Sequence, residues 1–256
     1  MGTLLLGTSG WDYPEWVGPV YPPRAVDKLR FYADRFPIVE VNSTFYRLPD
    51  PSVAASWVRR TPPRFRFAAK FPKTITHELR LERADAELGR FLEVLAPLRR
   101  AGRFVAALLQ LPPSLPFDPG VARAFYAALP GELPVAVEFR ERSWRVPASY
   151  ALLREFGLAN VVVDGPHLPI AAEVTAPFAY VRWHGHGRPI WYDYTYSAEE
   201  LAAWVPRLRE LAATTTAVYG FFNNHFRGDA ASNCRSLAAE LGIPRPSGPS
   251  LRPLDG

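Results

Sequence analysis

Short apolar runs recur along the chain and alternate with segments that have helical periodicity. Each run is about as long as one β-strand and is rich in Val, Ile, Leu, Phe and Ala. The hydrophobicity within a run is nearly continuous, which is typical of parallel strands that are buried on both faces. The eight runs cover residues 3–9, 38–44, 65–71, 104–111, 134–140, 160–165, 178–185 and 217–224.

Segments with the spacing of amphipathic helices lie between most of these runs. Ser197 and Glu200 have the spacing of a capping box at the start of one segment. Asp229 and Gly242 are suited to begin and end the last one. The connection after the sixth run, residues 166–177, is too short and irregular for a full helix. The predicted helices cover residues 25–36, 52–60, 79–103, 121–129, 147–157, 197–213 and 229–242.

This alternation, in a chain of 256 residues, predicts a single α/β domain folded as a (β/α)₈ barrel of the TIM type. An open doubly wound sheet is the structural alternative. The residues after the first run, GTSGW, lack the G-x-G-x-x-G pattern that dinucleotide binding would need there. We expect the barrel to occupy residues 1–242 and a tail rich in Pro, Ser and Gly to occupy residues 243–256.

Composition and charge narrow the classes of function. Cys234 is the only cysteine, which excludes an internal disulfide and a thiolate metal cage, and its helical context favours a buried structural thiol. No apolar run is long enough to span a membrane, and the first residues lack a basic leader, so we expect a cytoplasmic protein. The net charge of +5 mildly favours acidic partners, although the arginines are scattered through the helical segments.

Each apolar run turns polar at or near its carboxyl end. In a barrel of parallel strands these ends meet at one mouth, where active sites of this architecture lie. Glu138 and Arg140 are two residues apart, as are Arg182 and His184, so each pair shares a face of its strand. The polar residues at these ends are Ser9 and Trp11, Glu40, Asn42 and Thr44, Lys70, Gln110, Glu138 and Arg140, Asp164, Arg182 and His184, and Asn223 and Asn224.

Aromatic residues also crowd the segments that follow the strands. Such rings suit stacking on a sugar or a base, and they equally suit lids that pack on top of a barrel. Both interpretations stay open. The residues concerned are Trp11, Tyr13, Trp16, Tyr46, Trp144 and the aromatic residues of 191–196.

Seven ordered motifs resemble those of the YecE-like family, a domain of unknown function. They are GTSGWDYPEWVGPVYP, VEVNSTFYRLP, KFPKTITH, LLQLPPS, AVEFRERSW, YVRWHG and FFNNHFRGDAASNC. The resemblance spans nearly the whole chain, to about residue 242, and implies a TIM-barrel fold without supplying a reaction. Its most distinctive motifs hold Ser9, Trp11, Glu40, Asn42, Tyr46, Asn223 and Asn224.

The residue types at the predicted mouth favour an enzyme, a hydrolase or lyase, that cleaves a phosphate- or sugar-containing substrate without metal or cofactor. Glu40 and Glu138 are the candidate acid/base pair, and His184 is the alternative proton shuttle. Cationic side chains would hold an anionic group. The expected substrate-binding residues are Ser9, Trp11, Asn42, Tyr46, Lys70, Gln110, Arg140, Asp164, Arg182, Asn223 and Asn224.

Three other hypotheses remain open at this point. Glu40, Glu138, Asp164 and His184 could hold a divalent metal ion, as in barrel isomerases or nucleases. The protein could bind nucleic acid without catalysis, since the net charge and the aromatic residues permit it. The polar groups could also form a purely structural layer, with the carboxylates neutralised by Lys70, Arg140 and Arg182. His77 and His225 are expected to be hydrogen-bonding residues of loops.

Overall fold

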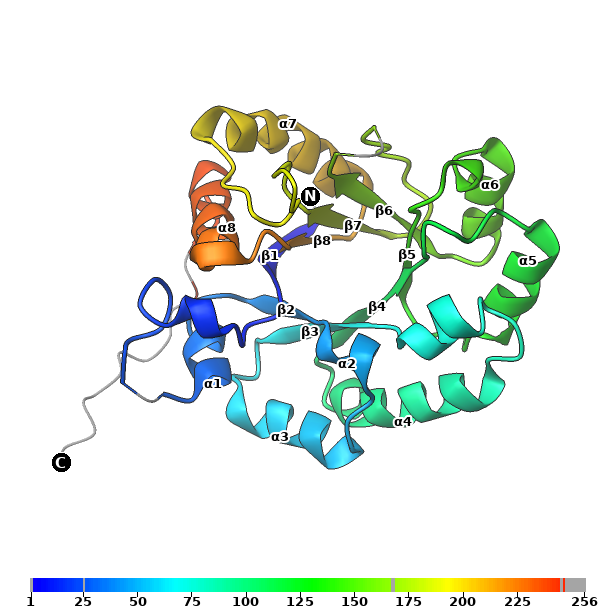
Figure 1. Ribbon diagram of the computed structural model, residues 1–256, viewed down its shortest axis with the longest axis horizontal. Coiled ribbons are helices and arrows are strands. Elements are labelled where there is room, and N and C mark those ends of the chain that lie inside the picture. Colours follow the sequence, from blue (N-terminus) through cyan, green and yellow to red (C-terminus); the bar gives the residue numbers. More distant parts are fainter. Residues whose placement is uncertain (1, 25, 167–168, 245, 247–256) are drawn as a thin grey trace.

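The computed structural model describes residues 2–24, 26–166, 169–244 and 246, and in it eight parallel strands close into a barrel in chain order. The predicted fold is therefore confirmed (Figure 1). β1 pairs with β8 over six positions, from Thr3 opposite Ala217 to Thr8 opposite Phe222, and this pairing closes the ring. The strands are β1 (Thr3–Ser9), β2 (Ile38–Val41), β3 (Arg66–Lys70), β4 (Phe104–Gln110), β5 (Val135–Glu138), β6 (Ala159–Asp164), β7 (Phe178–Trp183) and β8 (Ala217–Phe222).

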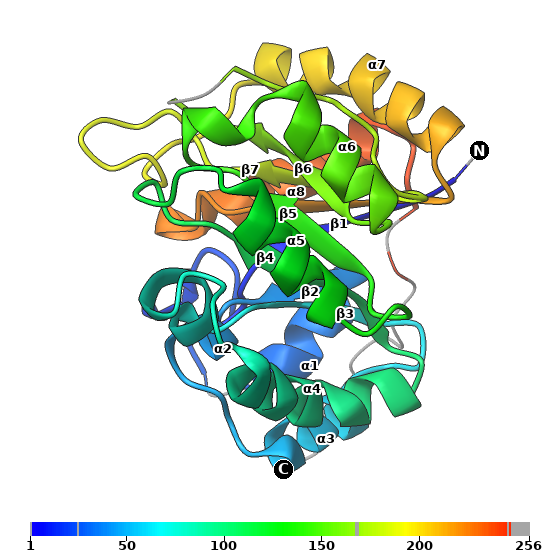
Figure 2. The ribbon, with the colours of Figure 1, turned by 90° about the vertical axis from the view of Figure 1, so that its right-hand side faces the viewer.

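Helices surround the barrel, and the segments that follow the strands gather at one end of it (Figures 1 and 2). The capping box at the start of α7 is present, because Ser197 Oγ accepts from the Glu200 backbone and the Glu200 side chain accepts from the Ser197 backbone. The helices are α1 (Lys28–Ala33), α2 (Ser43–Tyr46), α3 (Pro51–Arg60), α4 (Asp85–Arg100), α5 (Pro119–Ala128), α6 (Pro147–Glu155), α7 (Ala198–Thr214) and α8 (Asp229–Glu240).

Three local predictions are wrong. The second strand does not reach Thr44: it ends at Val41, and Thr44 lies in α2, where its hydroxyl donates to the carbonyls of Val41 and Lys70. α4 is shorter than predicted because the backbone before Asp85 turns left-handed at three non-glycine residues, Arg80, Leu81 and Arg83. The N-cap of α8 is Gly228 rather than Asp229, which is the first residue of the helix.

The connection from β6 to β7 contains no helix among its described residues, as predicted. Side chains tie part of this irregular segment to the barrel. Asn160 Nδ2 donates to the carbonyls of Ala171 and Glu173, and Thr175 Oγ1 donates to Leu158 O. Most of the predicted tail, residues 245 and 247–256, lies outside the described residues. None of the helices in the described part of the chain combines the length and apolarity needed to cross a membrane.

Alternation along the strands sorts side chains between two apolar regions. One region fills the space between the strands and the helices and contains most of the large aromatic residues. The other fills the lower part of the barrel bore and includes Ile38, Leu108, Val161 and Phe221, all at most 4% exposed. Because side chains two apart share a face, the residue two positions after Ile38, Glu40, also points into the bore, one level nearer the mouth.

Candidate functional site

A buried ionic layer lies directly above the apolar part of the bore. Arg182 on β7 donates from Nη2 to Glu40 Oε1 of β2 at 2.7 Å and from Nη1 to Glu138 Oε2 of β5 at 2.5 Å. All three side chains are at most 2% exposed. Although burial alone would lower the pKa of Arg182, the charges of Glu40 and Glu138 outweigh it and raise that pKa above its ordinary value. One guanidinium therefore ties together three strands of the barrel.

Glu138 has two further partners in this layer. Arg140 Nε lies 2.5 Å from Glu138 Oε1, and His184 Nε2 lies 3.1 Å from the same oxygen. Burial alone would raise the pKa of Glu138, but the positive charges of Arg140 and Arg182 hold it well below its usual range. Burial, with the nearby Arg140, lowers the pKa of His184 to about 3. At neutral pH, Glu138 is thus ionised and His184 is neutral.

Glu40 completes the layer on the opposite side of the bore. Its Oε2 accepts a hydrogen bond of 2.7 Å from the hydroxyl of Tyr180, which lies two residues before Arg182 on β7. Burial and the charge of Glu40 raise the pKa of Tyr180 well above its ordinary value, so the phenol keeps its proton. Ser9, next to Glu40 in the strand register, is fully buried, and its Oγ has no hydrogen-bond partner among the described residues.

Lys70 stands at the end of β3, one level nearer the solvent. Its Nζ donates to Gln110 Oε1 at 2.7 Å and lies 3.9 Å from the ring centroid of Phe45. Burial, followed by the positive charge of Arg182, lowers the pKa of Lys70 from its ordinary 10.5 to about 7. The amine is therefore balanced between its charged and neutral forms at physiological pH.

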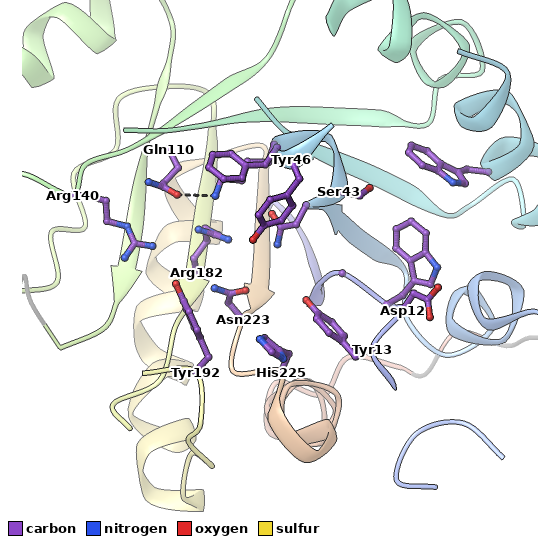
Figure 3. A pocket seen from close by; sticks show the side chains of 16 residues that line it. Asp12, Tyr13, Ser43, Tyr46, Gln110, Arg140, Arg182, Tyr192, Asn223 and His225 are labelled. Atoms are coloured by element: carbon purple, nitrogen blue, oxygen red, sulfur yellow. Dashed lines mark hydrogen bonds between the residues drawn. The ribbon is translucent and has the colours of Figure 1, made fainter. Parts of the chain in front are cut away.

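These groups border a pocket of ≈ 480 Å³ at the mouth of the barrel (Figure 3). Arg140, Arg182 and Tyr192 gather on one side of it, while Tyr13 and Tyr46 approach from the other. The dashed line that leaves Gln110 in Figure 3 is its bond to Lys70. The pocket is lined by Gly10, Trp11, Asp12, Tyr13, Asn42, Ser43, Phe45, Tyr46, Trp57, Lys70, Gln110, Arg140, Arg182, Tyr192, Asn223 and His225.

A second hollow of ≈ 340 Å³ adjoins this pocket and shares Gln110, Arg140 and Tyr192 with it. Its other walls are mostly apolar and include Phe139 and Trp191, with His184 as the polar exception. Arg140 therefore stands between a polar chamber and a more apolar one.

Most of the predicted site residues converge on this mouth. Glu40, Glu138, His184 and Ser9 lie just beneath the pocket, in the fully buried part of the bore. The predicted residues that line the pocket itself are Trp11, Asn42, Tyr46, Lys70, Gln110, Arg140, Arg182 and Asn223.

Two predicted substrate-binding residues lie elsewhere. Asp164 points to the outer face of β6, where Oδ2 accepts from Trp204 Nε1 of α7 at 2.8 Å and Oδ1 lies 2.6 Å from His186 Nε2. Asn224 is also turned away from the pocket and donates to Tyr194 O and to Asn233 Oδ1. Each residue follows one that faces the bore, so alternation turns it outward. Both residues anchor the segment between β7 and α7.

The predicted metal ligands do not converge either. With Asp164 on the outer face, Glu40, Glu138 and His184 remain in the bore, and their polar atoms are taken up by Arg140, Arg182, Tyr180 and Asn223. Within the described ranges, no group of three or more His, Cys, Asp or Glu side chains is arranged to hold a metal ion.

Several residues of the site were not among those predicted. Tyr180 could have been found by alternation, because it lies two positions before Arg182. Tyr13 and Tyr192 belong to the aromatic residues noted in the loops, but sequence alone does not say which rings reach the pocket. Nothing in the sequence marks Phe45 as a residue of the pocket. His225 borders the pocket while its Nδ1 lies 3.0 Å from Glu15 Oε1.

Comparisons with known proteins agree with the fold and the motifs. A family model described as "Protein of unknown function DUF72" matches residues 5–253. The UPF0759 protein YunF of Bacillus subtilis (strain 168) is 29% identical over an alignment of 285 residues, which covers 98% of this chain and 99% of YunF. The UPF0759 protein YecE of Escherichia coli (strain K12) is 30% identical over 241 residues, 83% of this chain and 84% of YecE.

A solved structure of a DUF72 family protein from Thermotoga maritima MSB8 superimposes with a TM-score of 0.87 at 32% identity and covers 94% of this chain and 99% of that one. The resemblance to the YecE-like family is thus confirmed over most of the sequence. The chain belongs to the DUF72 family of proteins of unknown function.

Proposed function

We propose that this protein is an enzyme that binds a small phosphate- or sugar-containing anion in the mouth pocket and cleaves it by acid/base chemistry. One observation carries the proposal: Lys70, Arg140 and Arg182 border one pocket, while the carboxylates that balance the two arginines lie beneath it. Asp12 is a carboxylate on the pocket wall itself, and Lys28 pairs with it at 2.5 Å, so an incoming anion would still meet cationic groups before it meets Glu40 or Glu138.

The charge of the site supports an anionic ligand. Glu40 and Glu138 balance Arg140 and Arg182, which leaves Lys70 as the group that can gain a positive charge. Because its pKa is about 7, a bound anion would favour its protonated form and draw a proton from solvent. Anion binding should therefore be tighter at pH 6 than at pH 8.

The same geometry favours Lys70 over the carboxylates for the acid/base role. Glu138 is fully buried and held ionised by Arg140 and Arg182, so it is poorly suited to deliver a proton at neutral pH. Lys70 borders the pocket, and its pKa of about 7 lies where a general acid or base works best. Glu40 and Glu138 would act as positioning residues for the arginines.

A small anion suits the pocket better than nucleic acid does. Among the described residues, six of the arginines on the outside of the barrel are paired with acidic neighbours, which breaks up the continuous positive stripe that a nucleic-acid backbone needs. These pairs are Arg60–Asp27, Arg90–Glu87, Arg99–Glu132, Arg123–Glu155, Arg154–Glu173 and Arg227–Asp193.

Calorimetry with inorganic phosphate and with sugar phosphates tests the proposal. Replacing Arg140 by Met should weaken phosphate binding about tenfold or more, because a charge-assisted hydrogen bond contributes roughly 1.5–3 kcal/mol. Binding should also be accompanied by proton uptake at pH 7–8, seen as a dependence of the measured heat on the ionisation enthalpy of the buffer.

The exposed Arg142, two residues along the chain, supplies the matched control, and Arg142→Met should bind phosphate like the wild type. Equal affinity of the Arg140→Met and wild-type proteins would contradict the proposed site. So would the absence of binding by any phosphate compound at millimolar concentration.

A further inference from the structure

Lys70 differs from the other lysines of the chain in its surroundings. Lys28 pairs with Asp12 at 2.5 Å and Lys73 with Glu78 at 3.0 Å, in both cases in partly exposed positions. In the described part of the chain, no carboxylate lies within 4.0 Å of Lys70 Nζ; its contacts are the amide oxygen of Gln110 and the ring of Phe45. An amine without a counter-ion, in a cavity, is what nucleophilic lysines require.

We propose that Lys70 is a nucleophile that forms an imine with the carbonyl carbon of its substrate. The proposal rests on the proposed function, since Arg140 and Arg182 would hold the anionic group of the same molecule. The neutral amine adds to the carbonyl to give a carbinolamine. This intermediate takes up a proton and loses the former carbonyl oxygen as water, which leaves a protonated imine. No oxidant or reductant is needed, and water reverses both steps.

The pocket supplies what this reaction needs around Lys70. Gln110 holds the amine at the pocket wall, and the Phe45 ring covers it on another side. The hydroxyl of Tyr46 points toward the middle of the pocket (Figure 3) and could pass protons to and from the carbinolamine oxygen, whereas the hydroxyl of Tyr13 donates to the Ser9 carbonyl. Arg140 and Arg182 lie on the side of the pocket opposite Tyr13 and Tyr46 (Figure 3), and the anionic end of a short substrate would rest against them.

The charges that face Lys70 come from three other strands or strand ends and act in opposite directions. Burial is the largest effect and lowers the pKa of Lys70; Arg182 and Arg140 also lower it, while Glu138 and Glu40 raise it. At a pKa of about 7, roughly half of the amine is free to react at neutral pH, against less than about one part in a thousand for an ordinary lysine.

A protonated imine withdraws electrons from the carbon next to it. The neighbouring C–H or C–C bond can then break, with the electron pair moving into the imine to give an enamine. The inferred substrate class is therefore a short aldehyde or ketone that also carries a phosphate or carboxylate, and the inferred reaction class is reversible C–C cleavage or loss of water.

Trapping with sodium cyanoborohydride tests this inference. The protein is incubated at pH 7 with glyceraldehyde 3-phosphate or with pyruvate, and reduction of the imine leaves a stable amine that peptide mass spectrometry can locate. With only three lysines in the chain, the assignment is simple. We expect Lys70 to be modified at least tenfold faster than Lys28, Lys73 or the N-terminal amine. Equal or slower modification of Lys70 would overturn the inference.

Lys70→Met should lose the fast adduct, and Lys73→Met, three residues away and exposed, should keep it. Protection of Lys70 in the wild-type protein by added phosphate provides a measurement that needs no variant. Phosphate binding by calorimetry without any Lys70 adduct would refute the imine and leave the proposed function standing. The opposite outcome can also be told apart. If the protein binds no phosphate, and Lys70 forms the adduct equally fast with glycolaldehyde, which has no anionic group, then the imine proposal stands and the anion site is refuted.

Discussion

Arg182 is the single side chain on which the ionic layer of the bore depends. It is 2% exposed and bonds two carboxylates that are themselves fully buried. A buried carboxylate without a partner is costly because water cannot solvate it. Among the described residues, Glu40 would retain only the hydroxyl of Tyr180 if this guanidinium were removed, whereas Glu138 would keep Arg140.

Replacing Arg182 by Met should therefore lower the free energy of unfolding by about 3–5 kcal/mol at pH 7. The deficit should shrink as the pH falls toward 5, since protonation of the stranded carboxyl removes its charge. Urea denaturation at both pH values measures the effect. The double variant Arg182→Met/Glu40→Gln is the control and should recover part of the loss. A loss below about 1 kcal/mol in the single variant would mean that water reaches the carboxylates.

The candidate site could be predicted in part at the level of single residues. Alternation along β5 and β7 correctly puts Glu138 with Arg140 and Arg182 with His184 on one face. Asp164 and Asn224 end predicted strands, and for this reason the sequence predicts both as substrate-binding residues. Each lies next to a residue that faces the bore, so its own side chain points outward. Which phase faces inward depends on the strand register, and register is a property of the closed sheet.

Among the contacts between secondary-structure elements, the close approach of β1 and β2 tolerates substitution least. A Cβ on Gly7 would lie 2.0 Å from the carbonyl oxygen of Ile38, which is a backbone atom fixed by strand pairing. Only glycine therefore fits at this position of the pair. The same two strands reach the level of the ionic layer two register positions further on, where Ser9 lies opposite Glu40.

Gly7→Ala should destabilise the protein by about 3 kcal/mol or more, because the backbones of β1 and β2 must move apart. Thermal and urea denaturation, followed by circular dichroism, measure the loss. Gly89→Ala in the exposed face of α4, where a Cβ meets nothing within 4 Å, is the matched control and should stabilise by about 0.5–1 kcal/mol. Similar stability of the two variants would mean that the pairing of β1 with β2 can yield without cost.

The strands and the long helices were predictable because their patterns are local. Continuous apolar runs mark buried parallel strands, and the capping box of α7 is visible as Ser197 and Glu200. α2 was missed because four residues are too few to show a period. The left-handed backbone at Arg80, Leu81 and Arg83 was also missed, since these residue types rarely adopt it and only the surrounding packing imposes it.

For the molecule as a whole, the burial of Lys70 makes stability depend on pH. Below pH 7 the folded and unfolded chains both hold the proton, and the folded chain bears the cost of a buried charge. Between pH 7 and 10.5 the unfolded chain holds more protons than the folded one, so the free energy of unfolding rises with pH in this window. Above 10.5 neither state bears the cost.

Lys70→Met removes this dependence. We expect the variant to be more stable than the wild type by about 1–3 kcal/mol at pH 6, because the buried charge is gone, and to lose that advantage by pH 10.5. Urea denaturation across this range measures the difference, with Lys73→Met as the control that should follow the wild type throughout. A Lys70→Met advantage that stays constant with pH would show that the amine is not desolvated.

The bridge that Arg182 makes to Glu40 and Glu138 also closes the barrel at that level, and the apolar side chains beneath it fill the rest of the bore. Among the described residues, the bore is thus closed beneath the pocket, and the pocket opens at the mouth of the barrel. A product formed at the bottom of the pocket must leave through the opening by which the next substrate enters, so product and substrate cannot occupy the pocket together. Any turnover here should slow as product accumulates, and more starting material should restore it.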